Sequence, residues 1–203
     1  MKTVAVIDYG MSNLRSVSKA LEHVAANNWQ VQVSDQADVI LQADKVVFPG
    51  QGAIGQCMHL LKESQLLDVI QQSVEEKPFL GICLGLQSLL TRSEENGGIA
   101  GFDVISGTVR RFADSPEYKI PHMGWNQVAQ QSHPLWNGIA DNSRFYFVHS
   151  YYVDLVDVVA GTTAYGGVNF ASAVAKDNVF AVQFHPEKSQ DVGLKLLENF
   201  LNW

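Results

Sequence analysis

The segment Pro78–Leu90 reads PFLGICLGLQSLL: an apolar run, then a cysteine between two glycines, then an apolar pattern of helical spacing. Gly81 and Gly85 each stand two residues from Cys83, which is the layout of a nucleophile elbow with cysteine in place of serine. Glycines allow the tight, strained turn from strand to helix that such an elbow needs. The sulfur is then expected at a helix N-terminus, where the peptide dipoles favour the thiolate. A buried structural cysteine is the alternative interpretation.

The sequence around this segment alternates between strands and helices. Short apolar, β-branched runs are separated by stretches whose apolar residues recur every three or four positions. This alternation predicts an α/β fold, with a mostly parallel central sheet flanked by helices on both faces. Ligands of such sheets bind at the carboxyl ends of the strands, where Cys83 stands. The expected strands are Val4–Ile7, Trp29–Val33, Lys45–Phe48 and Phe79–Ile82; the expected helices are residues 14–24, capped by Ser12 or Asn13, and residues 58–70, in one or two pieces.

The second half of the chain has a different pattern. Short strand-like runs with turn residues between them favour additional antiparallel strands there. No repeat, low-complexity tract or linker separates the two halves, so we expect one domain spanning residues 1–203. The expected strands are Phe102–Arg110, Arg144–Val148, Val158–Thr163, Phe170–Ala175 and Val179–Phe184, and a closing helix is expected at Val192–Leu201.

Composition argues against several classes of protein. The 203 residues are 46% hydrophobic and carry a net charge of −7, so a sizeable core is expected and a broad basic surface for nucleic acid is not. The apolar run near the N-terminus is too short for a signal peptide or a membrane span. The count of two cysteines, Cys57 and Cys83, decides little, but a reactive thiol fits a reducing cytosol. We expect a cytoplasmic protein with no nucleic-acid or membrane partner.

His185, Pro186 and Glu187 directly follow the last expected strand. Residues two apart on an extended chain face the same side, so the ring and the carboxylate are expected to point together toward the strand ends. A histidine beside the thiol accepts its proton and later passes it to a leaving amine, while a carboxylate fixes the imidazole tautomer. A His-Pro-Glu turn at the surface is the alternative. Beside a cysteine elbow in the same chain, a triad that includes Cys83 is the favoured interpretation.

Acyl transfer also requires hydrogen-bond donors for an oxyanion. In the elbow geometry, the backbone N–H of Leu84 is one such donor. The turn Pro49–Gly52, of sequence PGQG, follows the adjacent expected strand, and its glycines allow the Gln51 peptide to approach a substrate or to flip. Taken alone, this turn has an ordinary strand-ending interpretation.

Three motifs together resemble the class I (triad) glutamine amidotransferases: PGQG at residues 49–52, GICLGLQ at residues 81–87 and HPE at residues 185–187. Members of that family hydrolyse the side-chain amide of glutamine through a γ-glutamyl thioester and pass the ammonia to an acceptor site. The resemblance implies that Cys83 is the nucleophile, His185 the acid and base, and Glu187 the orienting carboxylate. It implies no cofactor and no metal. The residues that it implies for holding glutamine are Gly50, Gly52, Gln87, His149, Ser150 and Tyr151.

Four segments resemble the glutaminase subunits of imidazole glycerol phosphate synthases, enzymes of histidine biosynthesis. They are DYGMSNLRS at residues 8–16, PHMGWN at 121–126, YFVHSYY at 146–152 and QFHPEKS at 183–189. This resemblance covers essentially the whole chain. It implies a heterodimer with a separate (β/α)8-barrel cyclase, which uses the ammonia to make imidazole glycerol phosphate and aminoimidazole carboxamide ribotide. The residues implied at the partner interface or the ammonia exit are Asn13, Arg15, Trp125, Tyr146 and Lys188.

Each of these interface residues also has a simpler interpretation. Without the motif, Trp125 and Tyr146 would be core aromatics. Lys188 would be a solvated charge. Asn13 and Arg15 would be a helix cap and a solvated helix residue.

Two positions depart from the subfamily pattern. Leu86 stands where methionine is frequent, a change that conserves volume. Gln51 stands where a small apolar residue is frequent, but its backbone N–H is available whatever its side chain does. A glycine-rich turn with two peptide orientations, of which one is competent, predicts a glutaminase that is weak alone and activated by the ligand-bound partner.

Three other functions remain as alternatives. The first is an amidotransferase subunit for anthranilate, aminodeoxychorismate or pyridoxal phosphate synthesis, although chorismate-linked members usually carry histidine at the position of Leu86. The second is a stand-alone γ-glutamyl hydrolase or cysteine peptidase with the same elbow. The third is a non-catalytic binding subunit, which the presence of all three triad residues makes the least favoured.

Overall fold

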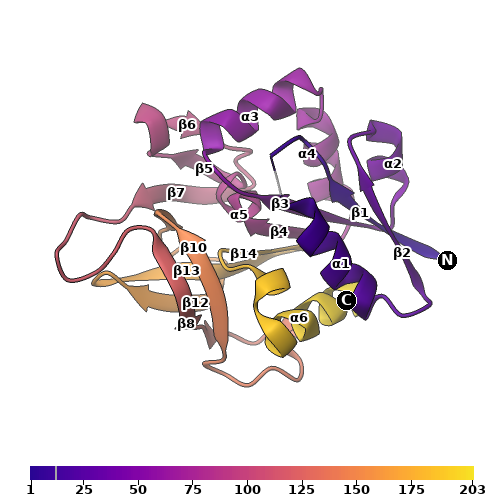
Figure 1. The fold of residues 1–203 in the computed structure, drawn as a ribbon. Helices are drawn as coiled ribbons and strands as arrows, with labels where there is room; N and C mark the ends of the chain where they lie inside the picture. The colour runs from indigo at the N-terminus through magenta and orange to yellow at the C-terminus, as the bar shows by residue number, and fades with distance from the viewer. Residues whose placement is uncertain (12) are drawn as a thin grey trace.

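The computed structural model describes residues 1–11 and 13–203, with strands and helices alternating in the first half and mostly strands in the second (Figure 1). The first half contains β1 (Lys2–Ile7), α1 (Leu14–Val24), β2 (Trp29–Ser34), α2 (Ala37–Gln42), β3 (Lys45–Gly50), α3 (Ile54–Glu63), α4 (Leu67–Glu76), β4 (Phe79–Cys83), α5 (Leu84–Gln87), β5 (Leu90–Ser93) and the 3-10 turn η1 (Glu95–Gly97). The second half contains β6 (Ile99–Ala100), β7 (Ile105–Arg111), β8 (His122–Gln127), β9 (Ala129–Gln130), η2 (Pro134–Trp136), β10 (Arg144–His149), β11 (Tyr151–Val153), β12 (Val159–Tyr165), β13 (Val168–Lys176), β14 (Val179–Val182), η3 (Pro186–Lys188) and α6 (Gln190–Asn202).

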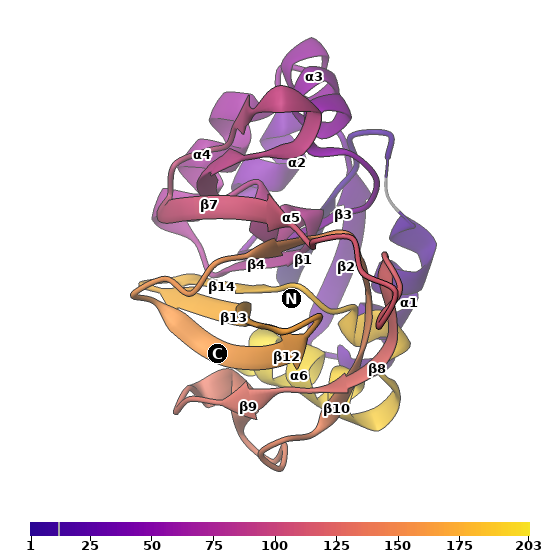
Figure 2. The ribbon, with the colours of Figure 1, turned by 90° about the vertical axis from the view of Figure 1, so that its left-hand side faces the viewer.

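The central sheet is parallel where the first half builds it. Strands β2, β1, β3, β4 and β14 lie side by side in that order and run parallel. Strand β13 adds antiparallel to β14, and β11 and β12 add antiparallel to β13. The sheet continues through β7, β5 and β6, while β8 and β10 pair in a separate antiparallel sheet (Figure 2). The predicted α/β fold, with added antiparallel strands in the second half, is confirmed.

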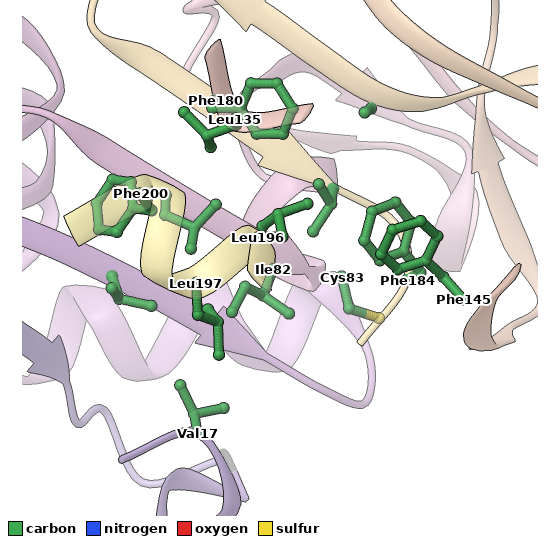
Figure 3. Close-up of a cluster of buried hydrophobic side chains, with 14 of the residues drawn as sticks. Val17, Ile82, Cys83, Leu135, Phe145, Phe180, Phe184, Leu196, Leu197 and Phe200 are labelled. Atoms are coloured by element: carbon green, nitrogen blue, oxygen red, sulfur yellow. The ribbon is translucent and has the colours of Figure 1, made fainter. Parts of the chain in front are cut away.

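Helices cover both faces of the parallel strands. Val4 and Val6 of β1 belong to the core cluster that includes residues of α1 and α6. The alternate residues Ala5 and Ile7 belong to the cluster formed with α2, α3 and α4. This division follows from the pleat of a strand, which points successive side chains to opposite faces. Figure 3 shows Cys83 among the residues of the first cluster, with Ile82 of β4 on one side and the rings of Phe145 and Phe184 on the other in this view.

The helix expected after Cys83 is much shorter than the sequence suggested. It ends as the single turn α5, and the chain extends again at Leu90, which pairs with Ile105 of β7. Tertiary strand pairing therefore overrides the helical spacing of the leucines. Asn13 stands at the N-cap position of α1, but its side chain makes no capping hydrogen bond, and Ser12 lies outside the described residues.

Within residues 1–11 and 13–203, no helix combines the length and apolar character needed to cross a bilayer.

Candidate active site

Cys83 occupies a strained turn between β4 and α5. Its backbone dihedral angles are φ 56° and ψ −105°, a conformation that costs a non-glycine residue free energy and persists only where the surrounding fold imposes it. The residue is buried, with 7% of its surface exposed. The nucleophile-elbow geometry expected from the sequence is therefore present in the backbone.

The two flanking glycines are required by close backbone contacts. A Cβ atom on Gly85 would lie 2.0 Å from the carbonyl oxygen of Phe48 on β3. A Cβ atom on Gly81 would lie 2.9 Å from the carbonyl oxygen of Gly85. The spacing around Cys83 thus lets α5 turn directly over the ends of β3 and β4.

Cys83 stands at the N-cap of helix α5, as expected, but this helix is short. Helix α5 has only four residues, whereas a macrodipole builds up over a longer run of aligned peptides. A neighbouring side chain, His185, also interacts with the charge of Cys83.

His185 and Glu187 meet across the 3-10 turn η3. The Nδ1 atom of His185 lies 2.8 Å from Oε1 of Glu187, and the two side chains are 7% and 2% exposed. The sequence argument assumed an extended chain, but β14 ends at Val182 and residues 186–188 form a helical turn. Pro186, with its fixed φ, begins this turn. The expected pairing is therefore present, although a different backbone geometry produces it.

The ring of His185 carries a proton that its neighbours stabilise. Burial alone lowers the pKa of His185, but the charge of Cys83, with the hydrogen-bonded Glu187, outweighs burial and raises the pKa to about 10. Glu187 is the hydrogen-bond partner of Nδ1 of His185. Among the described residues, Nε2 of His185 has no hydrogen-bond partner of normal geometry. Nε2 is therefore the ring nitrogen that is available for proton transfer.

The PGQG turn lies beside Cys83. Strand β3 continues to Gly50, which is the register partner of Cys83 on β4. A Cβ atom on Gly50 would lie 2.7 Å from Cβ of Leu84, and Gly52 has φ +88°, a value that glycine adopts readily. The side chain of Gln51 is exposed, so the departure at this position leaves the backbone of the turn accessible.

A cavity of about 420 Å³ brings most of the expected residues together. Gly50, Glu187 and Asn13 instead line a smaller adjoining hollow with His185. Arg15, Trp125 and Tyr146 line neither. The residues of the larger cavity are Gln51, Gly52, Cys83, Leu84, Gln87, Glu95, Pro121, Val148, His149, Ser150, Tyr151, His185 and Lys188.

Two polar residues of this region were missed by the sequence analysis. Glu95 lines the cavity, and its Oε2 atom accepts a hydrogen bond from the backbone N–H of Ile54 at 2.9 Å. Gln183 is fully buried, and its Nε2 atom donates to Sγ of Cys83 at 3.6 Å. The sequence did contain one signal for Gln183, which directly follows the apolar run Val179–Val182. A polar side chain that is buried at the end of such a strand requires hydrogen-bond partners.

His149 contributes to the cavity wall, but its ring nitrogens are occupied by protein groups. Nδ1 lies 2.7 Å from the carbonyl oxygen of Tyr151, and Nε2 lies 2.9 Å from Nδ1 of His122. Burial lowers the pKa of His149 to about 3 and the pKa of His122 to about 4. Both rings are therefore neutral at pH 7, and His149 supports the site without offering a ring nitrogen to a ligand.

Residues 5–203 match the family described as Glutamine amidotransferase class-I. The chain belongs to this family. Its full-length relatives include the imidazole glycerol phosphate synthase subunits HisH of Nitrosococcus oceani, Hydrogenovibrio crunogenus and Acinetobacter baylyi, at 56%, 54% and 51% identity. Each alignment covers all of this chain and 97–99% of the relative.

Solved structures agree on the amidotransferase fold. A crystal structure of a glutamine amidotransferase aligns with a TM-score of 0.73 at 18% identity, covering 97% of this chain and 98% of that one. A chain of the PurLQS structure from Thermotoga maritima aligns with a TM-score of 0.73 at 20% identity, covering 99% and 98%. At these identities the likeness concerns the fold alone.

The residues expected at a partner interface lie outside the amidotransferase cavity or at its rim. Trp125 of β8 and Tyr146 of β10 are register partners, and their rings pack edge to face with centroids 6.0 Å apart. Trp125 is 43% exposed, so it is not a core aromatic. Asn13, Arg15 and Lys188 are also exposed.

The second cysteine of this amidotransferase, Cys57, does not line the cavity. Cys57 lies on α3, is fully buried, and belongs to the core cluster on the α2–α4 face of the sheet. Burial raises the pKa of its thiol to about 12, so the thiolate is absent at neutral pH.

Proposed function

We propose that this chain is the glutaminase subunit of an imidazole glycerol phosphate synthase, with Cys83, His185 and Glu187 as its catalytic triad. The observation that carries the proposal is the buried His185, which lies between the Glu187 carboxylate and a cysteine on a strained elbow. The full-length HisH relatives support the assignment to this branch of the family. Residues 1–203 would act as one glutamine amidotransferase domain.

The first half-reaction forms a thioester. The Cys83 thiolate attacks the side-chain amide carbon of glutamine, and the carbonyl electron pair moves onto oxygen. The backbone N–H groups of Leu84 and Gln51 stabilise that oxyanion. The C–N bond then breaks as Nε2 of His185 gives its proton to the leaving nitrogen. Ammonia and a γ-glutamyl thioester result, and His185 is left neutral.

The second half-reaction restores the enzyme. Neutral His185 removes a proton from water as the water oxygen attacks the thioester carbon. The C–S bond breaks, glutamate leaves, and the thiolate–imidazolium pair forms again. Glu187 holds Nδ1 throughout, so Nε2 remains the nitrogen that exchanges protons.

The cavity offers groups suited to the α-amino and α-carboxylate ends of glutamine. Glu95 is the acidic residue among the described residues that line it, and we assign it to the substrate ammonium group. The other residues that we assign to glutamine binding are Gly52 of the oxyanion turn, Gln87 of α5, and His149, Ser150 and Tyr151 of the β10–β11 segment, which line the same cavity, and Gly50, which lines the adjoining hollow.

The partner in this proposal is a separate (β/α)8-barrel cyclase, bound as a heterodimer in the cytoplasm. The exposed Trp125 and its register partner Tyr146 on β8 and β10 support a contact surface beside the cavity. Lys188 lines the cavity and is exposed, so it lies at the cavity opening where ammonia would leave. Asn13 and Arg15, which are exposed at the start of α1, would also contact the partner. The reaction of this subunit requires no cofactor and no metal.

An assay of glutamine hydrolysis tests this proposal. The isolated chain, the chain with the cyclase, and the chain with the cyclase and its nucleotide ligand are compared. We expect weak hydrolysis by the isolated chain and a strong increase only when the liganded cyclase is present. Hydrolysis at the full rate by the isolated chain would contradict the coupling. Activation by a chorismate-using synthase in place of the cyclase would assign the chain to another pathway.

A further inference from the structure

We infer that Gln183 is a positioning residue for the nucleophile: its side-chain amide donates to the sulfur of Cys83, in an orientation imposed by the backbone carbonyl of Tyr151. The inference deepens the proposed glutaminase function. Gln183 has no exposed surface and stands two residues before His185, so one short segment supplies two groups that act on the same sulfur.

The contact with sulfur is a hydrogen bond to a large acceptor. Nε2 of Gln183 lies 3.6 Å from Sγ of Cys83, a distance that fits the greater radius of sulfur. A thiol accepts such a bond weakly, whereas a thiolate accepts it as a charged group. The bond therefore stabilises the ionised form of Cys83 more than the neutral form. A hydrogen bond that favours the thiolate over the thiol in this way lowers the pKa of a cysteine.

The orientation of both amides in this contact is forced. A backbone carbonyl only accepts hydrogen bonds, so the group of Gln87 that lies 3.0 Å from the Tyr151 oxygen is its Nε2. The same Nε2 lies 2.9 Å from the side chain of Gln183, which must present Oε1. Nε2 of Gln183 then has to face Cys83. Reversing either amide would place two donors or two acceptors against each other.

The Tyr151 carbonyl also belongs to a second series of hydrogen bonds, in which the donor and acceptor of each bond are again fixed. His149 donates from Nδ1 to the Tyr151 oxygen, which leaves Nε2 as an acceptor for Nδ1 of His122. Nε2 of His122 then accepts from Nδ2 of Asn126, 3.2 Å away on β8. If either ring were protonated, two N–H groups would face each other with no acceptor between them. The network therefore requires both imidazoles to be neutral. The network runs without a break from β8 to the nucleophile.

The same assignments determine what Gln87 offers to a substrate. Both N–H groups of its amide are used by Tyr151 and Gln183. Its oxygen is therefore the group left for a ligand, and an oxygen acceptor selects a donor such as the ammonium group of glutamine. Gln183 thus acts on both the nucleophile and, through Gln87, the recognition of substrate.

The test is the pH dependence of Cys83 alkylation by iodoacetamide, measured on the full chain by mass spectrometry of the Cys83 peptide. Gln183→Met keeps the volume and removes the donor. We expect the midpoint of alkylation to rise by about one pH unit, and the rate at pH 7 to fall up to about tenfold. Asn199→Leu is the matched control, because this α6 amide donates to the carbonyls of Leu135 and Asn137. It should lower thermal stability and leave the Cys83 midpoint unchanged.

A second readout uses glutamine hydrolysis in the complex with the cyclase. Gln183→Met should raise the KM for glutamine several-fold, because Gln87 loses the acceptor that fixes its amide, and should lower kcat. A folded Gln183→Met variant whose alkylation midpoint equals that of the wild type would overturn the inference. The alkylation needs no glutamine turnover, so this result is separate from any failure of the proposed glutaminase function.

The wild-type chain allows a measurement that needs no change at Gln183. The side-chain amide proton of Gln183 should shift in NMR spectra with the same midpoint pH as the alkylation of Cys83. In Cys83→Ser that titration should disappear. A Gln183 amide resonance that is unaffected by the ionisation of Cys83 would refute the contact, even if Gln183→Met fails to fold.

Discussion

The backbone N–H of His185 donates to the carbonyl oxygen of Tyr146 at 2.9 Å, which connects the start of the η3 turn to strand β10. Ser189 forms a second bridge between the same two residues, His185 and Tyr146. Its hydroxyl donates to the His185 carbonyl at 2.6 Å and accepts from the Tyr146 N–H at 3.0 Å. Tyr146 pairs with the exposed Trp125 on β8, so the two-stranded sheet is connected through Tyr146 to the backbone of His185.

Removing the Ser189 hydroxyl should weaken the connection between the two-stranded sheet and the η3 turn. Ser189→Ala leaves the Tyr146 N–H and the His185 carbonyl without their shared partner, at a cost of about 1–3 kcal/mol in the free energy of unfolding. We expect kcat for glutamine hydrolysis in the cyclase complex to fall as the His185 ring loses its fixed position. Ser73→Ala is the control, because Ser73 is also fully buried but donates to Val69 within α4. An equal loss of kcat in both variants would mean that general destabilisation is the cause.

Gly85 should tolerate no side chain. In Gly85→Ala the new Cβ would meet the Phe48 carbonyl oxygen at 2.0 Å, and neither backbone can move without disturbing the elbow. We expect a loss of about 3 kcal/mol or more in the free energy of unfolding, measured by urea denaturation. Gly55→Ala on α3 is the control, since its nearest contact is the Asn96 side chain at 3.3 Å. That variant should have stability close to the wild type.

The buried histidine pair should make the protein sensitive to acid. The pKa values of His149 and His122, about 3 and about 4, lie below the ordinary value of 6.5, so the unfolded chain binds protons before the folded chain does. Stability is therefore complete above pH 6.5 and is lost as the pH falls toward 4, by up to about 1.4 kcal/mol per pH unit for each ring. His122→Phe should lower stability at pH 7.5 but give a shallower decline between pH 6.5 and 4. An unchanged slope in urea denaturation would contradict the assignment.

Glu95 should act on substrate binding more than on turnover. Glu95→Gln removes the negative charge that we assign to the ammonium group of glutamine, so the KM for glutamine should rise about tenfold or more. The kcat should change little, because the thiolate and the oxyanion donors are intact. Glu94→Gln is the control, since Glu94 pairs with Arg110 and does not line the cavity. Steady-state kinetics of glutamine hydrolysis in the cyclase complex distinguish the two variants.

Much of the fold could be predicted because local patterns and tertiary structure agree there. The apolar runs that become β1, β3 and β4 have the continuous burial of parallel strands, and the glycines at residues 81 and 85 correctly indicated the elbow. The prediction was wrong at Leu90, where pairing with β7 replaces a helical pattern. Pairing between distant strands leaves no local signal, since the partner residues are far apart in the sequence.

The site was predictable where a motif stands at a strand end, as at Cys83 and His185. The positions of Glu95 and Gln183 were not predictable, because their roles arise from contacts between segments remote in the chain. Gln183 touches residues 96 and 100 positions away, Gln87 and Cys83. The N-terminal position of Cys83 on a helix was predictable, but the shortness of that helix, four residues, was not.

The most direct test of the central claim compares Cys83→Ala with the wild type in the complex with the cyclase. Synthesis of imidazole glycerol phosphate is measured once with glutamine and once with added ammonia as the nitrogen source. We expect the variant to lose synthesis from glutamine and to keep synthesis from ammonia. Loss of both activities, or retention of synthesis from glutamine, would contradict the assignment of Cys83 as the nucleophile that supplies ammonia.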